Sequence, residues 1–112
     1  MQTTKTKTII DQIVQRIKNH LDPDKVILFG SYAYGQPSFN SDIDILIIKD
    51  LDKSEVKNYR ILAKKYVRDI VLNNDIDIDI IVDSWPRIRE RIKMGDLFLK
   101  EITEKGKVIY GQ

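Results

Sequence analysis

Hydrophobic residues near the start of the chain follow a helical period and then give way to a short continuous run. From Thr8 to Leu21 they recur every three or four positions, which predicts an amphipathic helix. The Asp22-Pro23-Asp24 segment predicts its end, because proline cannot continue a helix. The run from Lys25 to Phe29 predicts a buried strand. A short helix is expected to begin at Ser31, an acceptable N-cap.

The rest of the chain alternates strand-like and helix-like segments. Residues 36–41 have loop chemistry. Further strands are expected at 42–48, 76–82 and 107–110, and further helices at 54–72, 86–94 and 96–105. In the long helix the expected core positions are Val56, Tyr59, Ile61, Leu62, Tyr66 and Ile70, and in the last helix Leu97, Phe98 and Ile102. The pattern predicts one α/β (α+β) domain over residues 1–112, with a small mixed sheet of three to four strands flanked by helices.

Composition narrows the class of protein. Hydrophobic residues make up 42% and charged residues 32%, which is ordinary for a globular domain. No apolar run approaches the roughly 20 residues of a membrane helix, so no membrane partner is expected. A net charge of +2 is too small for a nucleic-acid footprint, so direct nucleic-acid binding is not expected. The absence of cysteine excludes disulfides and Cys-based chemistry and fits a cytoplasmic location.

The candidate chemistry is concentrated between Gly30 and Asp44. Gly30 and Ser31 are followed by ten residues and then by Asp42 and Asp44, which open an apolar strand. Two carboxylates two apart on a strand point to the same face, and they repel unless a cation or a proton compensates. The Gly-Ser turn is close enough to fold back beside them. A phosphate held by backbone N–H groups would then lie next to metal-binding carboxylates, which is the layout of a nucleoside-triphosphate site.

A third carboxylate is available from the next predicted strand. Asp75, Asp77 and Asp79 alternate with isoleucines and share one face, so periodicity alone does not choose among them. We favour Asp79 over Asp77, because a run of three apolar residues follows it just as one follows Asp44. Equal depth in the sheet would bring these two side chains to the same height. Three converging aspartates suit Mg²⁺, and two such ions can clamp the oxygens of a phosphoryl-type transfer.

Simpler interpretations exist for each acidic motif. An Asp-x-Asp pair at a strand start is common surface chemistry, and the run from Asp75 to Asp79 would also suit the solvent face of an edge strand. The run is not an EF-hand loop, since the required glycine and distal glutamate are missing. The segment from Gly30 to Gly35 is not a Walker A loop, because Gln36-Pro37 follows where Lys-Ser/Thr is needed.

Taken together, Gly30-Ser31, the ten-residue spacer, Asp42-x-Asp44 and a later strand aspartate resemble the DNA polymerase β-like nucleotidyltransferase superfamily. The small size is similar to its minimal nucleotidyltransferase (MNT) branch, and the ending EKGKVIYG resembles the MNT tail. The resemblance implies the polymerase β-like fold, with Gly30 and Ser31 binding the triphosphate and Asp42, Asp44 and Asp79 as catalytic, Mg²⁺-binding acids. It also implies transfer of AMP from ATP to a hydroxyl, with release of pyrophosphate.

The resemblance further implies a partner. Many MNT proteins are antitoxins that pair with a HEPN-domain toxin, adenylylate one of its tyrosines and bind it in a hetero-oligomer. One position departs from the family pattern, because Tyr34 stands where many relatives have arginine. A tyrosine offers a phosphate one neutral hydrogen bond instead of a bidentate ion pair. Compensating cations could come from Lys49, Lys53 or Arg60.

Two other functions stay open at this point. The chain could be a non-catalytic module that neutralises its partner by masking it. It could also be a nucleotidyltransferase whose acceptor is a small molecule such as an aminoglycoside, although 112 residues leave little room for a built-in acceptor domain.

Overall fold

The computed structural model describes residues 4–35 and 42–111, which form four helices and four strands. The helices are α1 (Thr4–Leu21), α2 (Lys53–Asn73), α3 (Trp85–Lys93) and α4 (Leu97–Lys105). The strands are β1 (Lys25–Phe29), β2 (Ile43–Ile48), β3 (Ile78–Asp83) and β4 (Lys107–Tyr110). None of these helices is long and apolar enough to cross a membrane within the described ranges.

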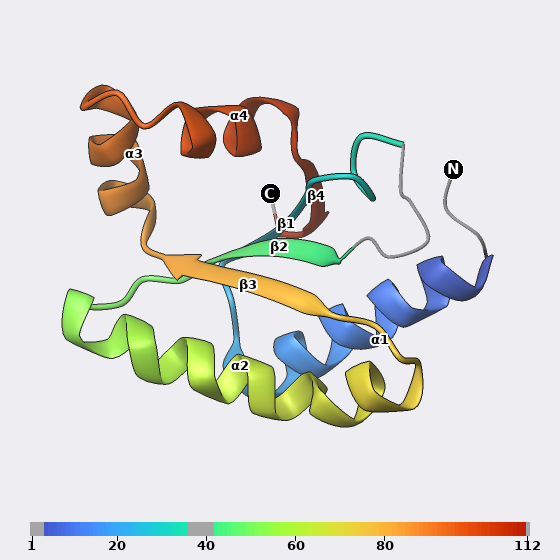
Figure 1. The fold of residues 1–112 in the computed structure, drawn as a ribbon. Coiled ribbons are helices and arrows are strands. Elements are labelled where there is room, and N and C mark those ends of the chain that lie inside the picture. The colour runs from blue at the N-terminus through green and yellow to red at the C-terminus, as the bar shows by residue number, and fades with distance from the viewer. Residues whose placement is uncertain (1–3, 36–41, 112) are drawn as a thin grey trace.

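The four strands form one mixed sheet in the order β3-β2-β1-β4. Strand β1 pairs antiparallel with β2 and with β4, whereas β2 and β3 run parallel. A parallel pair needs a long crossover, and α2 supplies it. Helices α1 and α2 cover one face of the sheet, and α3 and α4 cover the other (Figure 1). The expected small mixed sheet flanked by helices is therefore confirmed.

Side chains along each strand point alternately to the two faces of the sheet, and they divide the core into two clusters. One face of the sheet packs on α1 and α2 through residues such as Val26, Ile45 and Val67. The other packs on α3 and α4 through Phe29, Leu46, Ile88 and others. Both faces of β1 and β2 are thus buried, which explains their continuous apolar sequences.

Three expectations about local structure differ from the structure. The helix expected at Ser31 is absent from the described residues, where 31–35 form turns closed by bonds from the Ala33 and Tyr34 N–H groups to the Gly30 carbonyl at 3.0 and 3.1 Å. Gly35 has φ +81°, a left-handed conformation that interrupts helical geometry there. The expected loop at 36–41 lies outside the described residues.

The other two differences concern which side of a helix is buried. In α2 the buried positions are Tyr59, Ala63, Val67 and Ile70, whereas Ile61 and Leu62 are 53% and 40% exposed. In α4, Ile102 is buried as expected, but Leu97 and Phe98 are 75% and 54% exposed. The core assignments of these four exposed residues were wrong, because short apolar segments offered more than one possible buried stripe.

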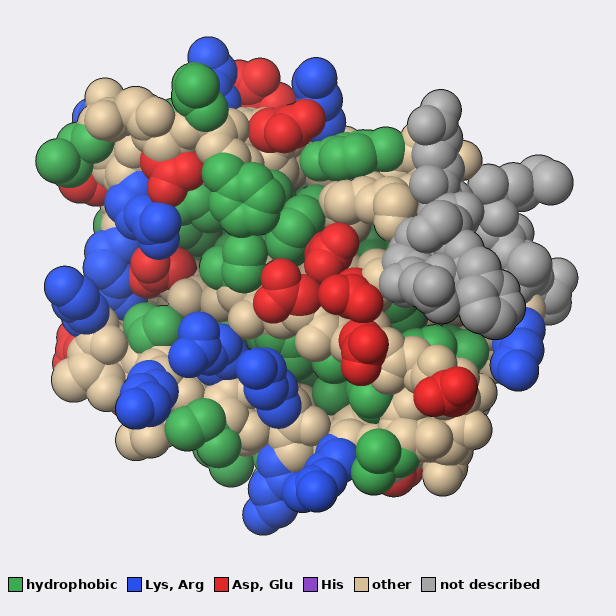
Figure 2. Space-filling view, in the orientation of Figure 1, with side chains coloured by type: hydrophobic (Ala, Val, Ile, Leu, Met, Phe, Trp, Pro, Cys, Tyr) green, Lys and Arg blue, Asp and Glu red, His purple; other side chains and the backbone are tan. Residues whose placement is uncertain are grey.

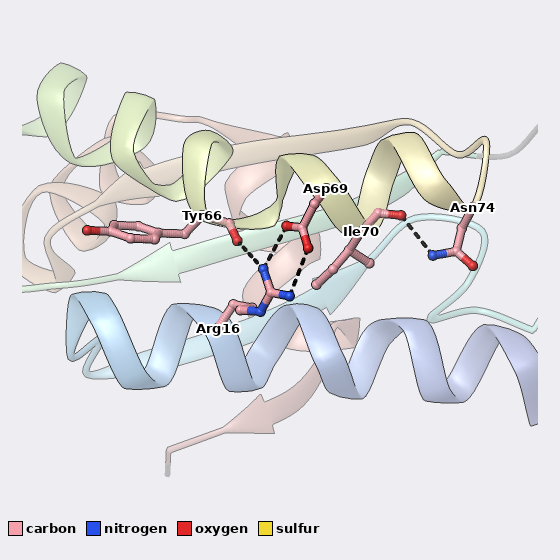
Figure 3. A network of polar contacts seen from close by, with 5 residues as sticks. All are labelled: Arg16, Tyr66, Asp69, Ile70 and Asn74. Carbon is pink, nitrogen blue, oxygen red and sulfur yellow. Dashed lines mark hydrogen bonds and ion pairs between the residues drawn. The ribbon is translucent and has the colours of Figure 1, made fainter.

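A polar network joins helices α1 and α2 (Figure 3). The Arg16 guanidinium on α1 binds both carboxylate oxygens of Asp69 on α2, at 2.7 and 2.9 Å. It also donates to the Tyr66 carbonyl at 3.1 Å. The hydrogen bond with Arg16 lowers the pKa of Asp69. This contact fixes how α1 and α2 lie against each other, and it occupies one of the two acids of α2.

Candidate active site

Asp44 and Asp79 lie side by side on neighbouring strands. The parallel register of β2 and β3 pairs Asp44 with Asp79, and the three apolar residues after each acid pair in turn. Register partners share a face of the sheet. The equal height expected for the two acids is therefore confirmed. Asp77 lies before the first residue of β3, and its carbonyl accepts a hydrogen bond from the Ile43 N–H at 3.0 Å.

Asp44 and Asp79 lie on the face of the sheet that α3 and α4 cover, because they alternate with the residues that pack on α1 and α2. Asp44 is also the antiparallel partner of Phe29, which belongs to the core cluster on that face. In Figure 2, acidic side chains gather over the first halves of β2 and β3, with hydrophobic side chains above them and basic side chains below and to the left. The acidic surface is thus bordered on two sides by surfaces of different chemistry.

The carboxylates of this site interact electrostatically. Burial raises the pKa of Asp44 to about 6, and the negative charges of Asp79 and Asp42 add to the increase. Asp42 and Asp79 themselves are exposed. Because both neighbours contribute to the shift, Asp42 and Asp79 each lie within electrostatic range of Asp44.

The donor set suits a hard divalent cation, since carboxylate oxygens are the ligands that Mg²⁺ prefers. The side chains do not yet converge, however: in residues 4–35 and 42–111 no three Asp, Glu, His or Cys side chains have the arrangement of a formed metal centre. The backbone register sets where these carboxylates start, and exposed side chains rotate within nanoseconds. Binding of Mg²⁺ by Asp42, Asp44 and Asp79 therefore stays a prediction, and it requires their carboxylates to rotate toward one another.

Gly30 brings the turn into direct contact with Asp44. Its φ is +72°, a left-handed conformation that glycine adopts without strain. A Cβ atom added at this position would lie 2.2 Å from Oδ2 of Asp44, so only a glycine lets the backbone approach the carboxylate this closely. Ser31 follows in a half-buried position. The structure thus brings the Gly-Ser turn to the acids, while binding of a phosphate by Gly30 and Ser31 stays a prediction.

Tyr34 and α4 lie near the Gly30 turn and near Phe29, the register partner of Asp44. Burial and the nearby Glu101 carboxylate raise the pKa of the Tyr34 phenol, and a hydrogen bond with the Gly30 backbone partly offsets this. The Phe98 ring packs edge-on against Phe29, with ring centroids 5.7 Å apart. No local sequence pattern indicated that Phe98 and Glu101 would lie near the site, because their position depends on how α4 crosses the sheet.

The three cations suggested as replacements for the missing arginine lie elsewhere. The Lys49 ammonium donates to the Asp22 carbonyl at 2.6 Å, and Lys49 follows the end of β2 opposite to Asp44. Lys53 and Arg60 line a groove between α2 and α3 that also includes Asp83, the last residue of β3. Tyr34 therefore has no compensating cation among these three at the Gly30 turn.

The raised pKa of Asp44 predicts how stability depends on pH when no metal is added. Between the ordinary value of 3.8 and about 6, the folded protein holds a proton that the unfolded chain has released, so stability falls as pH rises through this range. A shift of about two units has an upper limit of about 3 kcal/mol, and we expect about 1 kcal/mol because water screens this partly exposed group. Urea unfolding in EDTA at several pH values measures the slope. The same slope in an Asp44→Asn variant would contradict the assignment.

Comparison with known proteins identifies the family. The model of the family described as "Polymerase beta, Nucleotidyltransferase" matches residues 11–112. A protein of Methanocaldococcus jannaschii named "Putative protein adenylyltransferase MJ0604" is 37% identical over 86 residues, which cover 77% of each chain. A second protein of that organism, "Putative protein adenylyltransferase MJ1305", is 40% identical over 67 residues, which cover 57% of this chain and 42% of that protein.

Solved structures agree at the level of the fold. A crystal structure of a toxin–antitoxin with AMP-PNP matches with a TM-score of 0.58 and 21% identity, over 91% of this chain and 73% of that one. A mutant of the toxin–antitoxin MntA–HpeT matches with a TM-score of 0.57 and 20% identity, over the same shares. With the family model matching nearly the whole length and the sheet carrying the acids in register, the chain belongs to the polymerase β nucleotidyltransferase family.

Proposed function

We propose that this chain transfers AMP from ATP to a hydroxyl group of a partner protein, most specifically a tyrosine of a HEPN-domain toxin, and so acts as an antitoxin. The observation that carries the proposal is the pairing of Asp44 with Asp79, with Gly30 packed against the Asp44 carboxylate. The similarity to proteins named as protein adenylyltransferases supports a protein acceptor. The fold shared with toxin–antitoxin structures, one of them with AMP-PNP, supports ATP and a partner.

The residues have distinct roles in the proposed reaction. Gly30 and Ser31 would hold the triphosphate, and Asp42, Asp44 and Asp79 would hold Mg²⁺, which would neutralise charge on the phosphates and on the attacking oxygen. The acceptor oxygen forms a bond to the α-phosphorus, and the bond from that phosphorus to the oxygen bridging to the β-phosphate breaks. Pyrophosphate leaves, and Asp79, on the edge strand, accepts the hydroxyl proton.

Transfer of label from ATP labelled at the α-phosphate, with Mg²⁺ and the HEPN-domain protein, tests this proposal. We expect Asp79→Asn to slow transfer by about 100-fold or more, as removal of one charge-stabilising group typically does. Asp77→Asn is the matched control, because it removes an equal charge two residues away and should leave the rate close to that of the wild type. Equal losses in the two variants, or full transfer by Asp79→Asn, would refute the role of Asp79.

A non-catalytic masking function is the second candidate, and Tyr34 is the observation that favours it. A neutral phenol that faces Gly30 and Glu101 offers a triphosphate less than the arginine common in relatives. A chain that only masks its partner would protect cells equally well with Asp42 and Asp44 both replaced by alanine. The proposed catalytic antitoxin loses protection in that variant.

A further inference from the structure

Helix α2 carries a row of basic side chains along its solvent side. We call it the basic stripe; its residues are Lys53, Lys57, Arg60, Lys64 and Arg68, all exposed. Their spacings of three and four residues put them on one side of the helix. At 1.5 Å per residue the stripe is about 22 Å long.

The acids of α2 do not pair with the stripe. The two acids of α2 are engaged elsewhere: Glu55 accepts a bond from the Asp52 N–H at 2.9 Å, and Asp69 binds Arg16 at 2.7 Å. In the described part of the chain, none of the five stripe residues forms an ion pair. Like charges three or four residues apart destabilise a helix. An anionic partner would remove this repulsion.

Helix α3 extends the basic surface across a groove of about 580 Å³. Lys53, Lys57 and Arg60 line one side of the groove, and Arg87 and Arg91 line the other, together with Asp83 and Glu90. The Arg87 guanidinium is held in place, since it donates to the Asp83 carboxylate at 2.6 Å and to the Leu51 carbonyl. The groove therefore keeps a positive balance.

Apolar side chains accompany the stripe toward the acidic site. Ile61 is 53% exposed and Leu72 68% exposed, and helical spacing places both next to stripe residues. A second groove, of about 440 Å³, is lined by Ile61, Lys64 and Arg68 together with Asp77 and Ile78. It ends at the start of β3, one residue from Asp79. In Figure 2 basic side chains extend along α2, from the region of α3 to below the acidic surface.

We infer that the basic stripe is the docking surface for an acidic, partly apolar helix of the acceptor protein, which brings the acceptor hydroxyl toward Asp79. Its role in presenting that hydroxyl depends on the proposed adenylyltransferase activity. Charge complementarity and the exposed Ile61 and Leu72 fit such a helix. Single-stranded nucleic acid fits less well, because it is usually held by aromatic stacking and the residues lining both grooves include no aromatic ring.

Fluorescence anisotropy with three labelled probes tests the inference. The first is a helical peptide of about 16 residues, the length of the stripe, with glutamates every three or four positions and leucines between them. The second has lysines in place of the glutamates, and the third is a single-stranded RNA of mixed sequence. We expect the acidic peptide to bind and the triple variant K57Q/K64Q/R68Q to weaken it by about tenfold.

The variant K93Q/K105Q/K107Q is the matched control, since it removes three exposed positive charges from other elements. It should leave the affinity for the acidic peptide nearly unchanged. The reversed variant K57E/K64E/R68E should bind the lysine peptide instead. No binding of the acidic peptide, equal weakening in the control, or tighter stripe-dependent binding of the RNA would each overturn the inference.

Kinetics separate this inference from the proposed function. In K57Q/K64Q/R68Q we expect the KM for the protein acceptor to rise about tenfold, while kcat and the Mg·ATP dissociation constant stay at wild-type values. Failure of the wild type to transfer AMP at all would refute the proposed function, and the peptide measurements would still decide whether the stripe binds an acidic helix. A fall in kcat with unchanged KM would refute docking.

Discussion

Replacing Asp44 with asparagine is expected to abolish AMP transfer while making the metal-free protein more stable. Asp44 is the half-buried member of the acid group, and burial together with Asp79 and Asp42 raises its pKa to about 6. At neutral pH the folded protein therefore carries the negative charge of Asp44 in a partly buried position next to two other acids. Asparagine has nearly the same shape and no charge, so the repulsion disappears.

The two effects of Asp44→Asn have separate measurements. In EDTA at pH 7.5 we expect the free energy of unfolding of Asp44→Asn to exceed that of the wild type by about 1 kcal/mol. This corresponds to a rise in Tm of about 4 °C. The transfer rate should fall by about 100-fold or more. Mg²⁺ should raise the Tm of the wild type and not that of the variant, because a ligand stabilises only a protein that binds it.

Asp11→Asn is the control, since Asp11 is an exposed acid on α1, far along the chain from the site. It should change neither stability nor rate. A metal-free Asp44→Asn protein that is less stable than the wild type would show that the Asp44 carboxylate makes favourable contacts in the fold, which would contradict the interpretation of its raised pKa.

Replacing Gly30 with alanine is expected to have the second large effect. The added Cβ would lie 2.2 Å from Oδ2 of Asp44, so either the turn or the carboxylate must move. The backbone also has φ +72°, where a residue other than glycine costs about 1–3 kcal/mol. We expect a loss of stability of that size. We also expect the transfer rate to fall by about 100-fold, because small displacements of groups that position the substrate slow a reaction strongly.

Gly95→Ala separates strain from the contact with Asp44. Gly95 also has a positive φ, +101°, but a Cβ there meets nothing within 4 Å. This control should lose stability and keep its activity. If Gly95→Ala and Gly30→Ala slow transfer equally, the close approach of Gly30 to Asp44 has no role in the reaction.

The pairing of Asp44 with Asp79 was predictable, because the same pattern of an acid followed by an apolar run occurs twice in the sequence. Asp44 and Asp79 are each followed by three apolar residues, and two buried parallel strands align where such runs match. Neighbouring Asp77 precedes β3, so the same alignment excludes it from the position beside Asp44.

Other features depended on packing that no local pattern encodes. In α2 the small residue Ala63 is buried where the helix lies close to the sheet, whereas Ile61 and Leu62 turn outward. The order of α3 and α4 across the sheet placed Phe98 against Phe29 and Glu101 near Tyr34. The stripe on α2 was not among the sequence predictions, and its lack of ion pairs depends on Glu55 and Asp69 contacting other groups.

Calorimetric titration of ATP into the wild type and into an Asp42→Asn/Asp44→Asn double variant, each with Mg²⁺ and with EDTA, tests the central claim most directly. The claim is that the Gly30 turn and the paired acids form one metal–nucleotide site. It predicts that the wild type binds ATP only with Mg²⁺, and that the double variant loses this Mg²⁺-dependent binding while remaining folded. Equally tight Mg²⁺-dependent binding by a folded double variant would contradict it.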